Sequence, residues 1–271
     1  MFIPNTDQFN FPEDTAGHYM EVHMDRGITF DEHYPYVDNS FSFRFKRFWV
    51  RVLLRLIVFP MTYFKMGLKI EGKDNLKRYK KELQNGAVTI ANHVHRWDYI
   101  CVMKAVHNYH WPYLISWDKN VNGEDGPLVR LVGGIPIPLH DNNATVAFNK
   151  AVNKVLQDKN FLHIYPEGSM WEYYSSIRPF KRGAAAFAIR NNKPVLPLAF
   201  TYREPSALRK KLFKQIALFT LHVGKPIYTN NDLERNDKVD DLTIRMNLAV
   251  KELAKFKDQK VYPPIYQEKG E

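Results

Sequence analysis

The chain has 271 residues, of which 45% are hydrophobic, 14% aromatic and 25% charged. This composition excludes an intrinsically disordered protein and a collagen-like repeat, and the length suffices for one large domain with its own core. The single cysteine, Cys101, excludes an internal disulfide, so we expect a reducing compartment.

The net charge of +10 is unevenly distributed along the chain. Residues 1–40 carry eight acidic side chains and one basic one, Arg26, and they lack periodicity, so we interpret them as an acidic N-terminal arm. The other 231 residues hold 38 Lys and Arg against 21 Asp and Glu, a net charge of +17. A body of this charge attracts polyanions, such as an anionic membrane surface, an acidic carrier protein or nucleic acid.

The most apolar stretch, residues 48–64, is too interrupted to span a bilayer. A spanning helix needs about 20 mostly apolar residues, whereas the longest uncharged run here, Leu56 to Phe64, has nine and contains Pro60. Within 41–68, arginines recur every three to four residues opposite bulky apolar side chains, at Arg44, Arg47, Arg51 and Arg55. This pattern predicts an amphipathic helix in the plane of the lipid head groups, with its guanidinium groups on phosphates. The alternative is a helix packed on the domain with a solvated basic face.

From Gly86 onward, short apolar runs alternate with helical patterns. We predict strands at 87–91, 113–117, 135–139, 161–165, 195–202 and 216–224. Apolar residues at helical spacing predict helices at 144–156, 183–189 and about 238–257. Strands that alternate with helices predict an α/β layered domain.

Two polar clusters follow buried strands of this domain: residues 92–98 (NHVHRWD) after strand 87–91, and residues 165–169 (YPEGS) after strand 161–165. Ligands of open α/β sheets bind beyond the carboxyl ends of the strands, so we expect both clusters to face one crevice. A turn between His93 and Asp98 lets the carboxylate orient the imidazole, whose other nitrogen then removes a proton. The alternative is a helix-capping Asp98 with a hydrogen-bonded His93. No G-x-S-x-G motif is present, so the nucleophile would be a substrate hydroxyl.

Several matches in the same order give the chain a resemblance to the glycerophospholipid acyltransferase family, the PlsC-like group that contains 1-acylglycerol-3-phosphate O-acyltransferase. The family has an NHx4D motif, a glycine- and proline-rich motif, an FPEGT-type motif, a K-x-G-A-A stretch and a V-x-P-V strand. The corresponding segments here are 92–98, 133–137 (GGIPI), 165–169, 181–185 (KRGAA) and 195–198 (VLPL). The resemblance extends from about residue 70 to 225 and implies a single mixed-sheet catalytic domain over residues 69–271.

The resemblance also implies a reaction and its residues. His93 would deprotonate a lysolipid hydroxyl, most simply that of 1-acylglycerol-3-phosphate, which attacks the thioester of acyl-CoA or acyl carrier protein, and Asp98 would orient His93. The substrate-binding residues would be Glu167, Gly168, Ser169, Lys119, Arg178, Lys181 and Arg182. No metal or prosthetic group is needed, and we expect a peripheral protein on the cytoplasmic face of the cell membrane, with no nucleic acid partner.

Two departures from the family pattern bear on the acceptor. Met170 follows Ser169 where the family has an arginine that meets the acceptor phosphate, and the middle motif ends at His140 instead of arginine. Arg178, Lys181 and Arg182 are candidate replacements, because a phosphate ester binds any well-placed guanidinium or ammonium. The alternative acceptor is a lysolipid without phosphate, such as a glycolipid or an amino-acid lipid. A nucleic-acid or lipid-surface binding protein without catalysis rests on the basic charge alone.

Other polar residues have simpler interpretations. His95 is expected to have a structural role beside His93, with a second base as the alternative, and His163 is expected to lie in the core within its strand. The basic run from Arg209 to Lys214 is typical of a solvated face, although it also suits contact with lipid head groups.

Overall fold

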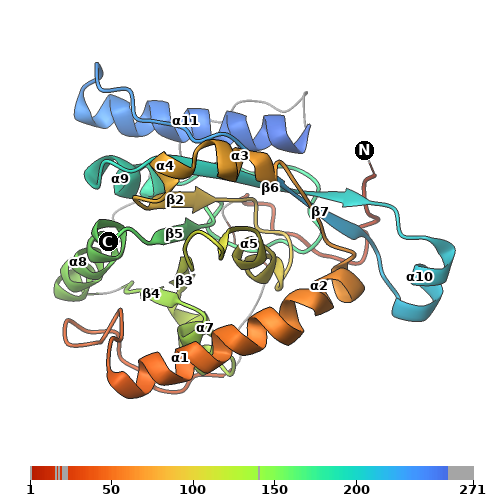
Figure 1. The fold of residues 1–271 in the computed structure, drawn as a ribbon, viewed down its shortest axis with the longest axis horizontal. Helices are drawn as coiled ribbons and strands as arrows, with labels where there is room; N and C mark the ends of the chain where they lie inside the picture. Colours follow the sequence, from red (N-terminus) through yellow and green to blue (C-terminus); the bar gives the residue numbers. More distant parts are fainter. Residues whose placement is uncertain (1, 16, 18, 20–23, 140, 256–271) are drawn as a thin grey trace.

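The computed structural model describes residues 2–15, 17, 19, 24–139 and 141–255 (Figure 1). Within these residues, seven strands form one sheet in the order β1-β7-β6-β2-β5-β3-β4. All neighbouring strands are parallel except β6 and β7, so the sheet is mixed, as predicted. The strands are β1 Lys69–Glu71, β2 Ala87–Ile90, β3 Tyr113–Trp117, β4 Gly134–Ile137, β5 Phe161–Ile164, β6 Val195–Arg203 and β7 Leu218–Val223.

Helices cover both faces of the sheet. They are α1 Phe41–Leu53, the π-helical turn η1 Leu54–Val58, α2 Phe59–Met66, α3 Lys73–Arg78, α4 Lys80–Leu83, α5 Asp98–Val106, α6 Asp118–Asn122, α7 Gly126–Leu131, α8 Asn142–Gln157, α9 Gly183–Arg190, α10 Ala207–Phe213 and α11 Arg235–Ala254. The predicted strands are all present, and the sequence missed only the short edge strand β1. The last helix begins at Arg235, and residues 256–257 of its predicted range lie outside the described residues.

The strands in the middle of the sheet are buried on both faces, which is why they read as continuous apolar runs. Every residue of β2 and β5 is buried. One face packs against α2, α4 and α5, and its core includes Met66, Leu83 and Val102. The opposite face packs against α8, α9 and α11, and its core includes Val152 and Met246. The result is a three-layer α/β/α domain (Figure 1).

The predicted amphipathic helix spans α1, η1 and α2, and part of its basic stripe packs on the domain, which differs from the alternative of a packed helix with a solvated basic face. Arg47 is only 7% exposed, and its guanidinium donates to Tyr113 Oη at 3.0 Å. Arg51 and Arg55 lie over the Trp111 ring. The expectation that this stripe contacts head-group phosphates is therefore wrong for Arg47, which is buried against the domain, whereas Arg44 and Arg55 are exposed.

The apolar side chains of the same helix face solvent, namely Phe41, Phe45, Phe48, Trp49, Leu53, Leu56, Ile57, Tyr63 and Phe64. We call these residues the α1–α2 apolar face. The π turn precedes Pro60, which has no N–H to continue the α-helical hydrogen bonds and whose ring crowds the preceding turn. None of the helices in the described part of the chain combines the length and the hydropathy of a membrane span.

The N-terminal arm contains no helix or strand among its described residues before Phe41, yet it packs against the domain. Tyr36 is buried in the core on the α8 side of the sheet. Arg130 donates to the Tyr36 carbonyl at 2.7 Å, and Asn122 accepts from the backbone nitrogen of Ile28 at 3.0 Å. These contacts hold the arm along α6 and α7.

Candidate active site

The two polar clusters lie next to each other because β2 and β5 are adjacent parallel strands, with Ile90 opposite Ile164. The loops beyond these strand ends are joined by backbone hydrogen bonds. Trp171 donates to the His93 carbonyl at 3.0 Å, and Tyr173 donates to the Val94 carbonyl at 2.9 Å. The structure thus brings residues 92–98 and 165–169 together at one edge of the sheet, which is where α/β proteins bind their ligands.

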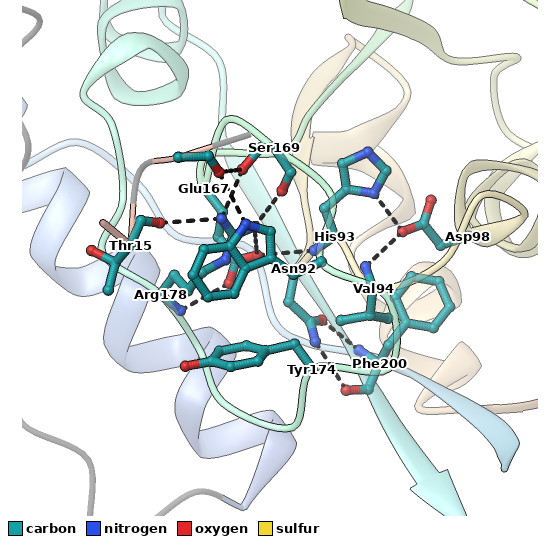
Figure 2. A network of polar contacts seen from close by, with 12 residues as sticks. Thr15, Asn92, His93, Val94, Asp98, Glu167, Ser169, Tyr174, Arg178 and Phe200 are labelled. Carbon is teal, nitrogen blue, oxygen red and sulfur yellow. Dashed lines mark hydrogen bonds and ion pairs between the residues drawn. The ribbon is translucent and has the colours of Figure 1, made fainter. Parts of the chain in front are cut away.

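His93 and Asp98 form a short, oriented pair (Figure 2). Nδ1 of His93 lies 2.7 Å from Oδ2 of Asp98, and the two side chains are 23% and 1% exposed. The same oxygen accepts from the backbone nitrogens of Val94 at 3.1 Å and His95 at 3.3 Å. Asp98 therefore both closes the turn before α5 and fixes His93 with its proton on Nδ1. This leaves Nε2 as the nitrogen that can accept a proton, on a ring that is partly exposed.

Tyr165 completes the surroundings of this pair, a role that the sequence did not reveal. Its hydroxyl donates to Oδ1 of Asp98 at 2.6 Å, and its ring stacks on His93 with the centroids 3.8 Å apart. Burial raises the pKa of Tyr165 well above its ordinary value, so the phenol stays a donor. Burial alone would raise the pKa of Asp98, but the charge of His93 and the hydrogen bonds from His93, Tyr165 and Val94 lower it.

Asn92 anchors the start of the same loop to strand β6. Its amide nitrogen donates to the Phe200 carbonyl at 3.2 Å, and its amide oxygen accepts from the Phe200 nitrogen at 2.7 Å. A side chain with one donor and one acceptor is needed for this pairing, and Asn supplies both. Asn92 is buried, so its contribution to the site is to place His93 rather than to contact a substrate.

A buried ion pair lies on the other side of His93. Glu167 and Arg178 are 3.0 Å apart, with their side chains 2% and 1% exposed. The Glu167 carboxylate also accepts from the backbone nitrogens of Arg178 at 2.9 Å and His93 at 3.1 Å. Arg178 further donates to Ser169 Oγ at 2.8 Å and to the Ser169 carbonyl. Figure 2 shows this network meeting the His93 backbone while the His93 ring turns toward Asp98.

The N-terminal arm covers this ion pair, which nothing in the sequence indicated. Arg178 donates to the Thr15 carbonyl at 3.2 Å. The Gly17 carbonyl accepts from Ser169 Oγ at 2.8 Å and from Trp171 Nε1 at 3.0 Å. The acceptors are main-chain carbonyls, which every residue type has. The sequence therefore could not predict these contacts.

The predicted substrate-binding cations lie in different surroundings. Arg178 is enclosed by protein, and Arg182 pairs with Asp240 of α11 at 2.7 Å. Lys119, at the carboxyl end of β3, lies with its ammonium 5.1 Å from the centre of the Trp117 ring. Lys181 also adjoins the PEG loop, which comprises residues 166–168, and its backbone nitrogen donates to the Pro166 carbonyl at 2.8 Å.

Gly168 and Lys181 are in close contact. Gly168 has a φ of 83°, and a Cβ at this position would come within 2.7 Å of the Lys181 ammonium nitrogen. The half-buried Lys181 has a pKa below its ordinary value, lowered first by burial and then by the charge of Arg178, while Asp14 raises it. Glycine is thus needed here both for its backbone conformation and for the space that Lys181 occupies.

Two further histidines, His95 and His163, have enclosed surroundings. Burial lowers the pKa of His95 to about 4, although the charge of Asp98 opposes this effect. His163 is fully buried, its Nδ1 is 2.9 Å from Thr89 Oγ1, and burial lowers its pKa to about 3. In the part of the chain that the structure describes, no group of three or more His, Cys, Asp and Glu side chains is arranged to hold a metal ion. His140, the last residue of the middle motif, lies outside the described residues.

Comparisons with known proteins agree with this architecture. A family model described as "Acyltransferase" matches residues 67–201. Among solved structures, the 1-acyl-sn-glycerophosphate (LPA) acyltransferase PlsC from Thermotoga maritima is similar, with a TM-score of 0.51 and 13% identity over 83% of this chain and 86% of that chain. A search of curated proteins found no match. The matched segment contains both polar clusters and the strands that position them, and the chain belongs to the acyltransferase family that this model describes.

Proposed function

We propose that the protein is an O-acyltransferase that esterifies a lysolipid hydroxyl with the acyl group of a thioester. Nε2 of His93 takes the proton of the hydroxyl while its oxygen attacks the thioester carbonyl carbon. The resulting tetrahedral intermediate collapses, the carbon–sulfur bond breaks, and the imidazolium returns its proton to the departing sulfur. The products are an ester and a free thiol.

The observation that carries the proposal is the 2.7 Å contact between His93 Nδ1 and Asp98 Oδ2. The carboxylate fixes the tautomer and stabilises the imidazolium that forms during the reaction, as in other orienter-and-base pairs. No protein nucleophile is required, because the substrate hydroxyl takes that role. Proton transfer by His93 also requires no metal or prosthetic group.

The acyl donor in this proposal is acyl-CoA or acyl carrier protein, and the reaction takes place at an anionic membrane surface. The α1–α2 apolar face supports the membrane part, because a row of exposed aromatic and aliphatic side chains on one helix is typical of an interfacial helix. The basic body of the protein suits both anionic lipids and an acidic carrier. Since these donors are cytoplasmic, we place the protein at the cytoplasmic face of the cell membrane.

Two acceptor classes follow from the surroundings of Ser169. Met170 provides no cation, and Glu167 already neutralises Arg178, which leaves Lys181 beside Gly168 as the partner for a phosphate. If Lys181 binds the phosphate, the acceptor is 1-acylglycerol-3-phosphate or a close analogue. The buried ion pair favours a second candidate, a lysolipid without phosphate such as a glycolipid or an amino-acid lipid.

The catalytic proposal is tested by acyl transfer from long-chain acyl-CoA and from acyl carrier protein to a panel of lysolipids, with products identified by mass spectrometry. We expect His93→Ala to lose activity while its far-UV circular dichroism and unfolding midpoint stay unchanged. His33→Ala is the matched control, because His33 lies in the arm with a largely exposed side chain. A normal rate in His93→Ala would rule out His93 as the base.

The acceptor is tested with Lys181→Glu, measured on acceptors with and without phosphate. If Lys181 binds phosphate, KM rises for the phosphate-bearing acceptor alone. Lys150→Glu is the control, since Lys150 is an exposed lysine on α8. Equal effects of Lys181→Glu on both acceptor classes would show that Lys181 is not the phosphate partner, and preferential acylation of the phosphate-free acceptors by the wild-type protein would support a lysolipid without phosphate.

A further inference from the structure

Helix α10 lies at the tip of the connection between the antiparallel strands β6 and β7, where residues 204–217 leave the sheet. Its apolar side chains Leu208, Leu212 and Phe213 are 65%, 62% and 54% exposed. None of its residues is buried. Seven residues are too few for a helix that is stable on its own in water, so α10 depends on contacts at its base and presents an apolar surface that the described part of the chain does not cover.

The contacts at the base join α10 to the end of α2. Arg209 donates to the Tyr63 carbonyl at 3.3 Å, and its guanidinium lies 5.5 Å from the centre of the Tyr63 ring. Gln215 donates to the carbonyls of Phe64 and Lys65, both at 2.8 Å. Tyr63 and Phe64 belong to the α1–α2 apolar face, so α10 is attached at the end of this face, and Figure 1 shows α10 next to the end of α2.

The charge around α10 suits an anionic surface. No acidic residue occurs between Glu204 and Asp232, or between Asp38 and Glu71 in the α1–α2 segment. On a helical wheel, Lys210 and Lys211 lie opposite the middle of the apolar side of α10, and Lys214 follows the helix in a left-handed conformation. Lys210 pairs with Glu204 at 2.7 Å, whereas Lys211 and Lys214 are exposed. Lysines around an apolar helix face are typical of helices that lie in the interface of an anionic bilayer.

We propose that α10 is a second lipid-binding element, which inserts Leu208, Leu212 and Phe213 into an anionic bilayer beside α2. This inference extends the proposed membrane association through α1 and α2. A single interfacial helix leaves a protein free to rotate about the helix axis, whereas two contacts that are not collinear restrict this rotation. The bilayer would then hold the catalytic domain in one orientation, with His93 at a constant height above the lipid.

Vesicle binding tests the proposal with the full chain. Affinity is measured by co-sedimentation with vesicles of phosphatidylcholine alone and of phosphatidylcholine with phosphatidylglycerol. We expect the double variant Leu208→Ser, Leu212→Ser to bind the anionic vesicles about tenfold more weakly or worse. The control is the double variant Val146→Ser, Leu248→Ser, which removes exposed apolar side chains from α8 and α11. Removal of Lys211 and Lys214 should weaken binding about fivefold for each lysine, on anionic vesicles only.

An environment-sensitive fluorophore on Leu212→Cys reports insertion directly. The native Cys101 is fully buried, so the label is selective. We expect a blue shift on anionic vesicles, and none for a label on Leu248→Cys. Unchanged binding of the Leu208, Leu212 double variant, or no shift at Leu212, overturns the proposal. A shift without vesicles that grows with protein concentration, together with a dimer in light scattering, identifies a second copy of the chain and also overturns it.

Acyl transfer in detergent micelles separates this inference from the proposed function. If the double variant of α10 retains wild-type transfer in micelles but loses vesicle binding, both proposals are supported. If the wild-type protein transfers no acyl group, the vesicle and fluorescence results still decide the role of α10. If the double variant loses its activity and its unfolding midpoint falls, the experiment is repeated with Leu212→Ser alone and with Leu248→Ser as its control.

Discussion

Removal of Arg178 should destabilise the protein far more than removal of an ordinary surface arginine. The substitution Arg178→Met leaves Glu167 buried without its cation, and it also removes the hydrogen bonds to Ser169 and Thr15. Loss of one partner of a buried ion pair costs about 3–5 kcal/mol of unfolding free energy. Lys154→Met is the control, because the pair of Lys154 with Asp158 is more than half exposed and should cost less than about 1 kcal/mol.

A double-mutant cycle tests whether the ion pair itself causes this loss. Glu167→Gln removes the charge and leaves Arg178 buried without its carboxylate, so it should also destabilise the protein by about 3–5 kcal/mol. The double variant has neither uncompensated charge, and we expect it to lose about 2–3 kcal/mol less than the two single variants together. Urea unfolding followed by far-UV circular dichroism gives the four free energies. A loss below about 1 kcal/mol for Arg178→Met, or strict additivity, would refute the reasoning.

Three further substitutions test the rest of the site. Tyr165→Phe removes the donor to Asp98, so stability should fall by about 1–3 kcal/mol and kcat should fall with it; equal kcat would show that this bond does not orient the base. Asn92→Asp turns a carboxylate toward the Phe200 carbonyl, and we expect a loss of about 2 kcal/mol or more by urea unfolding, whereas a neutral result would contradict the two-bond anchor. His163 has a folded-state pKa of about 3, so below pH 6.5 the unfolded chain binds a proton that the native protein does not, and stability falls by about 2 kcal/mol between pH 8 and pH 5. His163→Phe should remove this part of the acid sensitivity, and an unchanged pH slope would refute it.

The parts of the fold that the sequence predicted are those in which the local pattern carries the information. Strands β2 and β5 are buried on both faces, so they are continuous apolar runs that end abruptly in polar residues. Residues 92–98 and residues 165–169 each follow one of these strands. Because parallel strands end at the same edge of the sheet, the sequence also predicted that the two polar segments lie close together. Strand β1 has three residues, two of them charged, and becomes a strand only through its pairing with β7.

The missed features depend on contacts that no local pattern encodes. A helical wheel separates the arginines of α1 from its apolar residues, but it does not say which side faces the domain. The aromatic partners decide this: Tyr113 and Trp111 offer Arg47 and Arg51 a hydroxyl and a ring face, and these contacts turn the arginines inward. The pairing of Glu167 with Arg178 is likewise a tertiary contact, and the sequence predicted Arg178 only as a phosphate partner.

His93 connects two networks that differ in what they control. Its ring belongs to the Asp98 network, whereas its backbone nitrogen belongs to the Glu167 network. Substitution of Asp98 by Asn should therefore lower kcat mainly through the tautomer and charge of the ring, because the loop that carries His93 stays attached to Glu167. Substitution of Glu167 should lower kcat and stability together, because it releases that loop. If Asp98→Asn and Glu167→Gln reduced kcat and the unfolding free energy in the same proportion, the two networks would act as one, and the division between chemistry and positioning would not hold.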